Sequence, residues 1–212
     1  MLEIGSSSGA GSTEAFIEGA LTNPIRPTLH CIEVSDVRYE ALRLRHASRD
    51  FVRCYHASSV PVDKVASPAA VTDFYRTVRS PLNEYPLQTV LAWLEQDVRY
   101  LVEHGLDWSG IEHVKEANGL SRFDAVLIDG SEFTGSAELD AVYGASHILL
   151  DDIGTFKNHG NFARLSADPS YRLAEVSTDL RNGYAVFSLA SDASARREDT
   201  ESTTASSGDG CG

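Results

Sequence analysis

Short apolar runs alternate with segments of helical periodicity along the first 56 residues, and this alternation constrains the fold more than any other feature. The apolar runs are Met1–Gly5, Thr28–Val34 and Phe51–His56. Between them, Glu14–Leu21 and Asp36–His46 show the spacing of amphipathic helices. A strand–helix–strand order of this kind predicts a parallel sheet with helices on both faces, joined by right-handed crossovers.

The later part of the chain extends the same α/β pattern. Phe123–Asp129 and His147–Asp152 are continuous apolar runs, as expected for parallel strands buried on both faces. Tyr171–Thr178 and Tyr184–Ala190 lie on either side of an Asn-Gly turn, which predicts a closing antiparallel pair. One domain over residues 1–190 follows, with an acidic, aperiodic and therefore disordered tail over 191–212.

Residues 60–118 interrupt the alternation and are expected to form a helical insertion. Ala69–Val78 and Leu87–His104 are its predicted helices, and Leu91, Leu94, Val98 and Leu101 form an apolar stripe on the second. A stripe of Val37, Ala41 and Leu44 is likewise predicted on the helix after the second strand. The aromatic residues of the insertion could form a substrate lid or simply pack between helices; they are Phe74, Tyr75, Tyr85, Trp93, Tyr100 and Trp108.

Composition excludes several classes of partner. The formal net charge is −13, which argues against binding of the nucleic-acid backbone. No apolar run reaches the roughly 18–20 residues that a membrane span needs, and no secretory signal opens the chain. The three cysteines show neither metal-ligand spacing nor a disulfide framework, so a reducing cytoplasm is expected. The acidic surplus fits a high-salt cytoplasm, or equally a GC-rich genome and an acidic tail.

A glycine-rich turn between the first strand and the first helix is the main sign of a ligand. Its pattern is Glu3-x-Gly5-x-x-x-Gly9-x-Gly11, which lets a ligand approach the backbone and the helix N-terminus. The second strand ends in Glu33, where a carboxylate could accept both hydroxyls of a ribose or could simply be solvated. Together the two features favour an adenosine-type cofactor, although the dinucleotide pattern Gly-x-Gly-x-x-Gly and the Walker A ending are missing.

Three segments resemble class I S-adenosylmethionine (SAM)-dependent methyltransferases. Residues 2–9 (LEIGSSSG) resemble their first motif, 123–130 (FDAVLIDG) their fourth-strand motif, and 148–152 (ILLDD) the end of their fifth strand. The resemblance covers residues 1 to about 190 and is closest to the branch that tailors sugars and small natural products. It implies a Rossmann-like, seven-stranded, mostly parallel sheet. In that family a helix usually precedes the first strand, so a truncated N-terminus or cover from a second chain is left open.

Site roles follow from the resemblance by matching position. Glu3, Gly5, Gly9 and Asp129 would line SAM, Glu33 would hold its ribose, and Ser58 or Ser59 would lie near the adenine.

Three carboxylates at neighbouring strand ends predict a divalent metal ion. Asp129, Asp151 and Asp152 would repel one another unless a cation held them together, and hard cations such as Mg²⁺ prefer oxygen ligands. Aspartates at matching positions bind magnesium in the resembling O-methyltransferases. The alternative is that Asp151 caps a loop and Asp129 only orders the turn at Gly130.

The catalytic base and the acceptor stay open. Glu132, His159 and His56 are candidate bases, each with a plain surface role as the alternative. An acceptor that is itself a carboxylate needs no base, and Lys157, Arg164 or Arg181 could pair with it. The chain is similar to the hexuronic acid methyltransferases of archaeal protein N-glycosylation, which suggests a free or lipid-linked glycan as acceptor.

Two other functions remain open: an NAD-linked or nucleotide-sugar oxidoreductase, and a non-catalytic SAM-binding protein. The oligomeric state is also undetermined, with a homo-oligomer among the alternatives.

Overall fold

The computed structural model describes residues 1–190, so the tail predicted over 191–212 lies outside the described residues. The strands are β1 (Leu2–Ile4), β2 (Leu29–Glu33), β3 (Val52–His56), β4 (Ala125–Ile128), β5 (His147–Asp151), β6 (Tyr171–Ser177) and β7 (Tyr184–Leu189). The α-helices are α1 (Ser12–Thr22), α2 (Asp36–Arg45), α3 (Pro68–Thr77), α4 (Leu87–Glu103), α5 (Gly110–Asn118), α6 (Gly135–Val142) and α7 (Phe156–Ala167). Two 3₁₀ turns, η1 (Val62–Lys64) and η2 (Pro81–Glu84), flank α3.

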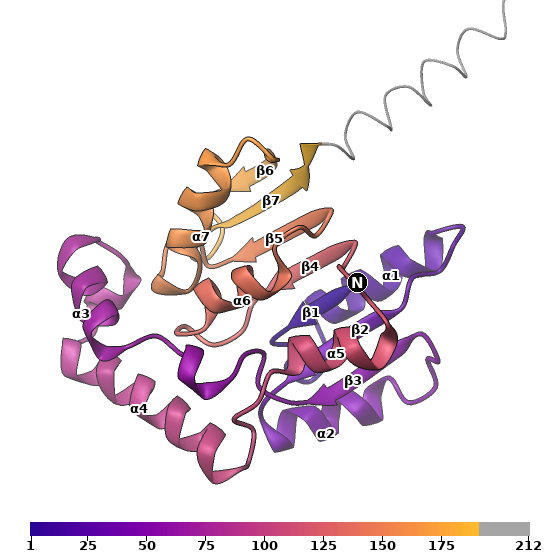
Figure 1. Cartoon of the computed structure of the whole chain (residues 1–212), viewed down its shortest axis with the longest axis horizontal. Helices are drawn as coiled ribbons and strands as arrows, with labels where there is room; N and C mark the ends of the chain where they lie inside the picture. Colours follow the sequence, from indigo (N-terminus) through magenta and orange to yellow (C-terminus); the bar gives the residue numbers. More distant parts are fainter. Residues whose placement is uncertain (191–212) are drawn as a thin grey trace, which may run out of the picture.

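All seven strands form one sheet in the order β3-β2-β1-β4-β5-β7-β6 (Figure 1). The first five strands are parallel to their neighbours, and β7 runs antiparallel between β5 and β6. This arrangement confirms the predicted seven-stranded, mostly parallel α/β sheet. The chain reverses its direction of winding between β1 and β4, and ligands of open α/β sheets bind at the carboxyl ends of strands beside such a point.

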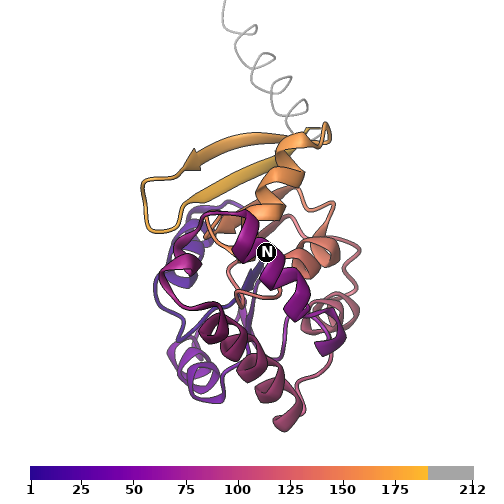
Figure 2. The ribbon, with the colours of Figure 1, turned by 90° about the vertical axis from the view of Figure 1, so that its left-hand side faces the viewer.

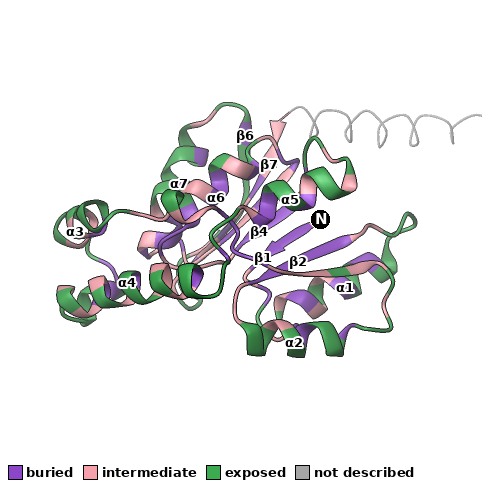
Figure 3. Cartoon of the chain, turned by 60° about the horizontal axis from the view of Figure 1, so that its bottom comes forward, coloured by how far each residue is buried: buried purple, intermediate pink, exposed green. Residues whose placement is uncertain are grey.

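Helices cover both faces of the sheet because alternate strand residues point to opposite sides. In β2, Leu29 and Cys31 pack with Ile17 of α1 and Leu42 of α2. The neighbouring Ile32 points the other way, into the main core. The side chains of α5, α6 and α7 in that core are Ile111, Val114, Leu139, Val142 and Leu165. Figure 3 shows the strands as the buried centre of the molecule and the outer faces of the helices as exposed.

The segment 60–118 divides into two parts with different roles. The last part, α5, packs against the sheet, since Ile111 and Val114 are fully buried in the main core. Helices α3 and α4 instead form a separate apolar cluster with Phe133, built on Val71, Val90 and Leu94. Figure 2, viewed from the side of these two helices, shows them in front of the rest of the molecule.

The predicted apolar stripe of α2 is wrong. Val37 is 80% exposed and Leu44 66% exposed, whereas Leu42 is fully buried. The helix therefore faces the sheet through the row that contains Leu42 and His46 rather than through Val37 and Leu44. On α4 the predicted stripe agrees better with the structure, because Leu94 and Leu101 are buried. Within residues 1–190, no helix is long and apolar enough to cross a membrane.

Candidate functional site

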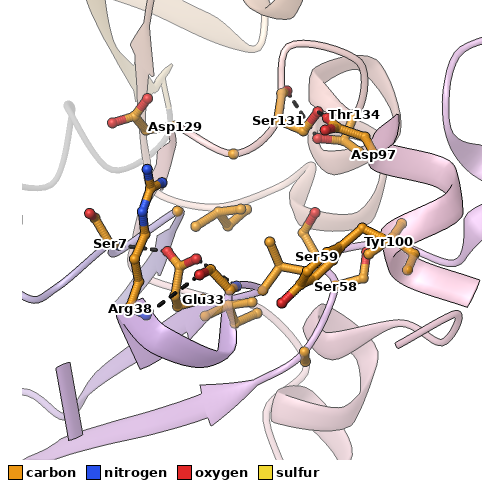
Figure 4. A pocket seen from close by; sticks show the side chains of 18 of the residues that line it. Ser7, Glu33, Arg38, Ser58, Ser59, Asp97, Tyr100, Asp129, Ser131 and Thr134 are labelled. Carbon is orange, nitrogen blue, oxygen red and sulfur yellow. Dashed lines mark hydrogen bonds between the residues drawn. The ribbon is translucent and has the colours of Figure 1, made fainter. Parts of the chain in front are cut away.

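A cavity of about 490 Å³ lies at the carboxyl ends of the parallel strands, between the sheet and α4 (Figure 4). Its polar wall includes Ser7, Glu33, Arg38, Ser58, Ser59, Asp97, Tyr100, Asp129 and Ser131. The first, second and fourth strands all end at this cavity, so residues far apart in the sequence meet at the point where winding reverses.

In the turn after β1, neighbouring parts of the protein leave no room for a side chain at two of the glycines. Gly5 has φ +83°, and a Cβ there would lie 2.0 Å from the backbone oxygen of Asp129. At Gly9, with φ +77°, a Cβ would lie 2.5 Å from Nε2 of His46, the residue that follows α2. Gly5 also borders the cavity, and Gly9 does not. The turn is thus fixed between β4 and α2, and it carries Ser7 to the cavity wall.

Glu33 is held in a fixed orientation at the end of β2. Its Oε2 accepts a hydrogen bond from the backbone amide of Ser7 (2.7 Å), and its Oε1 accepts one from the amide of Ser35 (2.8 Å). The residue is only 4% exposed, yet it borders the cavity. Each carboxylate oxygen has a second lone pair, so Glu33 can still accept hydrogen bonds from a ligand.

Glu3, expected to line a cofactor, lies beneath the turn instead. It is fully buried and does not border the cavity. Its Oε2 accepts a hydrogen bond from Thr13 Oγ1 (2.7 Å), which joins β1 to the first turn of α1. The position therefore supports the glycine turn from inside.

Ser58 and Ser59 both border the cavity, and each has a partner inside the protein. Ser58 donates to the backbone oxygen of Val60, and Ser59 donates to Oε1 of Glu138 (2.5 Å). Thr134 donates to the same oxygen (2.7 Å). Glu138 is fully buried, and burial raises the pKa of its carboxyl group. Nothing in the sequence distinguishes this glutamate from an ordinary surface residue of a short helix.

Helix α4 supplies the side of the cavity opposite the glycine turn. Asp97 and Tyr100 border the cavity, and Ser131 Oγ donates to Oδ2 of Asp97 (2.6 Å). Burial raises the pKa of the Asp97 carboxyl group. Of the six aromatic residues proposed as a lid, Tyr100 borders the cavity, whereas Phe74 packs edge-on against Phe156 in the α3–α4 cluster. No motif in the sequence indicates a role for Asp97.

Among the described residues 1–190, Arg38 is the basic residue in the wall of this cavity. It lies on the first turn of α2, and its side chain extends past Glu33 toward Asp129 (Figure 4). Arg38 is exposed to solvent, so its charge is available to a ligand. The sequence interpretation overlooked it because α2 shows no ligand-binding motif.

The three predicted metal ligands do meet at one place. One carboxylate oxygen from each of Asp129, Asp151 and Asp152 lies within 4.8 Å of the others. Asp152 reaches this position through a left-handed backbone conformation, with φ +57°. However, the ammonium group of Lys157 lies 2.8 Å from Oδ1 of Asp129 and 2.8 Å from Oδ2 of Asp152. A divalent ion bound there would have to displace this ammonium group, so the residues present do not fit a metal ion.

Lys157 is buried and stays charged. Burial acts to lower the pKa of its side chain, but the ion pairs with Asp129 and Asp152 outweigh this effect and raise the pKa. Lys157 does not border the cavity, and its ammonium group is already paired with two carboxylates, so it is not placed to bind an anion there.

Neither of the other two catalytic candidates borders the cavity. Glu132 accepts hydrogen bonds from Thr155 Oγ1 (3.1 Å) and from the backbone amide of Lys157 (3.1 Å), so it caps the start of α7. Burial raises the pKa of Glu132. His159 packs edge-on against Phe74, with ring centroids 5.5 Å apart.

The remaining alternatives also lie outside the cavity wall. His56 contacts the backbone oxygen of Val34 and stacks on Tyr39. Arg164 pairs with Asp140, and Arg181 lies 3.7 Å from Asp151 Oδ2.

Comparisons with known proteins give only distant likenesses. Neither the protein-family models nor the curated proteins yield a match. A methyltransferase from Geobacter sulfurreducens superimposes with TM-score 0.44 at 10% identity, over 89% of this chain and 69% of that one. An O-methyltransferase from Bacillus cereus in complex with SAH gives TM-score 0.46 at 11% identity, over 89% and 72%. Fibrillarin from Aeropyrum pernix with natively bound SAM gives 0.42 at 8%, over 88% and 64%. These likenesses are too distant to indicate a reaction or a substrate.

Proposed function

We propose that this protein is a SAM-dependent methyltransferase that methylates an oxygen atom of a small polar acceptor. The observation that carries the proposal is the orientation of Glu33 in the wall of the cavity at the reversal point of the sheet. A carboxylate fixed there by two backbone amides has lone pairs left for the two hydroxyl groups of a ribose. A cavity of about 490 Å³ falls within the range of small-molecule sites.

The rest of the wall offers partners for the other parts of SAM. Tyr100 provides an aromatic face near Ser58 and Ser59, which suits an adenine ring. Asp129 offers a negative charge to the ammonium group of the methionine part. When bound, SAM supplies an electrophilic methyl group on a sulfonium ion.

Asp97 is our candidate for the group that accepts the proton of the acceptor hydroxyl. One of its oxygens is occupied by Ser131, and burial raises the pKa of its carboxyl group toward the range in which a general base is effective. It lies across the cavity from Glu33 (Figure 4), so a ribose held at Glu33 would leave Asp97 free for the acceptor. The expected catalytic residues Glu132, His159 and Lys157 have no such access.

We propose a sugar or uronic acid, free or lipid-linked, as the acceptor. Among the basic residues considered, Arg38 is the one with access to the cavity, so a carboxylate on the acceptor would pair with it rather than with Lys157, Arg164 or Arg181. No divalent ion takes part in this proposal.

Titration of the purified protein with SAM and, separately, with NAD distinguishes the proposal from an oxidoreductase. We expect saturable SAM binding and no NAD binding. Incubation with SAM and uronic acids or glycans, followed by mass spectrometry, should reveal a methylated product. With a hydroxyl group as the acceptor, Asp97→Asn should bind SAM normally and lose turnover, whereas Asp73→Asn, at an exposed aspartate of α3, should behave as the wild type. Binding of NAD without SAM would refute the proposal, and SAM binding without any product would favour a non-catalytic role.

A further inference from the structure

We infer that Lys157 permanently occupies the cation position among Asp129, Asp151 and Asp152, so that the site works without a divalent metal ion. The ammonium group lies at hydrogen-bonding distance from two of the three carboxylates, 2.8 Å in each case. Lys157 is thus a positioning residue for Asp129, the member of the cluster that borders the cavity. Its importance for catalysis rests on the proposed function, whereas its effect on metal binding can be tested independently.

The backbone of Lys157 is fixed on both sides. Its amide donates to Glu132 Oε1 (3.1 Å) at the start of α7. Its carbonyl oxygen packs so closely on α6 that a Cβ at Gly135 would lie 1.9 Å from it. The next residue, Asn158, donates to the backbone oxygens of Ile128 and Asp151, which ties the helix to the ends of β4 and β5. The ammonium group therefore cannot leave the cluster by a shift of the helix.

The side chain cannot easily leave either. Lys157 is 7% exposed, and withdrawal of its ammonium group from both carboxylates would leave a buried, unpaired charge. A buried charge without a partner is strongly destabilising.

Two further oxygens of the cluster also have partners. Asp152 Oδ1 accepts a hydrogen bond from Asn182 Nδ2 (3.0 Å), and Asp151 Oδ2 faces the guanidinium group of Arg181 at 3.7 Å. Three negative charges thus meet two positive charges supplied by the chain. A magnesium ion requires oxygen ligands at about 2.0–2.1 Å in octahedral geometry. An ammonium group that contacts the same carboxylates would repel the ion.

The binding of Mn²⁺ alone, followed by electron paramagnetic resonance, tests the inference on the wild-type protein. We expect no Mn²⁺ site that depends on the aspartate cluster, so the wild type and Asp151→Asn should give the same titration. A wild-type Mn²⁺ site that Asp151→Asn or Asp129→Asn abolishes would overturn the inference.

A lysine variant provides the converse test. Lys157→Met removes the ammonium group and keeps an unbranched side chain, so three carboxylates are left without their cation. We expect this variant to bind Mn²⁺ at least about tenfold more tightly than the wild type and to gain thermal stability from it. Adding Asp151→Asn should remove the new site. Lys64→Met, at an exposed lysine of η1, is the matched control and should behave as the wild type.

A folded Lys157→Met protein that binds no Mn²⁺ would contradict the inference, because the cluster would then not be a cation position at all. If this variant does not fold, the wild-type titration alone decides the question. Neither result depends on SAM, so failure of the proposed function would be recognised separately in the SAM titration.

Discussion

At the scale of single residues, three carboxylates in or behind the cavity wall have different kinds of partner. Glu33 is bound by two backbone amides. Asp129 is paired with the ammonium group of Lys157. Glu138 has only the hydroxyl groups of Ser59 and Thr134, and its Oε2 has no hydrogen-bond partner among the described residues. Each carboxylate thus has a distinct electrostatic environment, which gives each a distinct experimental signature.

Glu138 should make stability depend on pH. Burial raises the pKa of this carboxyl group above its ordinary value of 4.5. An acid whose pKa is raised by folding keeps its proton longer in the native state, so its stabilising contribution is complete below pH 4.5 and is lost as the pH rises through the folded pKa. Glu138→Gln should therefore become progressively more stable than the wild type as the pH rises from 4.5 toward neutrality, as measured by urea unfolding.

The matched control for this series is Glu95→Gln, an exposed glutamate of α4. Its stability should follow that of the wild type at every pH. A difference in stability between Glu138→Gln and the wild type that does not change with pH would show that folding does not raise the pKa of Glu138.

Gly5 offers a test of the turn. Gly5→Ala places a methyl group 2.0 Å from the backbone oxygen of Asp129 in a backbone conformation with φ +83°. We expect a loss of about 2–5 kcal/mol in the free energy of unfolding, from backbone strain and overpacking. Gly19→Ala is the control, because α1 leaves open space there, and it should stabilise the protein by about 0.5–1 kcal/mol. Equal stability of the two variants would refute the geometry of the turn.

The sequence pattern predicts that glycine is needed in this turn, and the expected reason is that a ligand approaches the backbone there. The structure shows that the backbone of β4 and the ring of His46 are what exclude a side chain at Gly5 and Gly9. A single sequence cannot distinguish the two causes, because both require the absence of a Cβ atom.

At the scale of elements, predictability follows the strength of the local signal. The strands were predictable because continuous apolar runs mark buried parallel strands. Helix α7 was not predicted, since Phe156–Ala167 contains a glycine and two asparagines, which favour a helix only weakly. Tertiary contacts stabilise it instead: Glu132 caps its start, and Asn158 bonds to the ends of β4 and β5. The position of Lys157 could therefore not be predicted either.

Helix α4 should depend on its buried face. Leu94 is 3% exposed in the α3–α4 cluster, whereas Val102 on the same helix is 58% exposed. Leu94→Ala should lower the free energy of unfolding by about 2–5 kcal/mol through loss of burial and formation of a cavity. Val102→Ala should change it by no more than about 0.5 kcal/mol. Chemical denaturation measures both, and a small effect at Leu94 would mean that α4 is not anchored through this cluster.

At the scale of the whole molecule, the sheet order creates the site. The reversal of winding brings Gly5, Glu33 and Asp129 to one edge, which follows from the strand pattern alone. The contribution of α4 does not follow from that pattern. The packing of α3 and α4 against Phe133 decides which residue of the insertion, such as Asp97, reaches the cavity. Such long-range contacts produce no periodic pattern in the sequence.

Calorimetric titration of SAM into wild type, Glu33→Gln and Glu40→Gln tests the central claim most directly. Glu40 lies exposed on the neighbouring helix and pairs with Arg43, so its variant controls for the loss of one negative charge. We predict that SAM binds the wild type and Glu40→Gln equally, and binds Glu33→Gln about tenfold or more weakly, because hydrogen bonds to a charged acceptor are lost. Circular dichroism should show that all three proteins are folded. Equal SAM affinity of folded Glu33→Gln and the wild type, or no SAM binding by the wild type, would contradict the account.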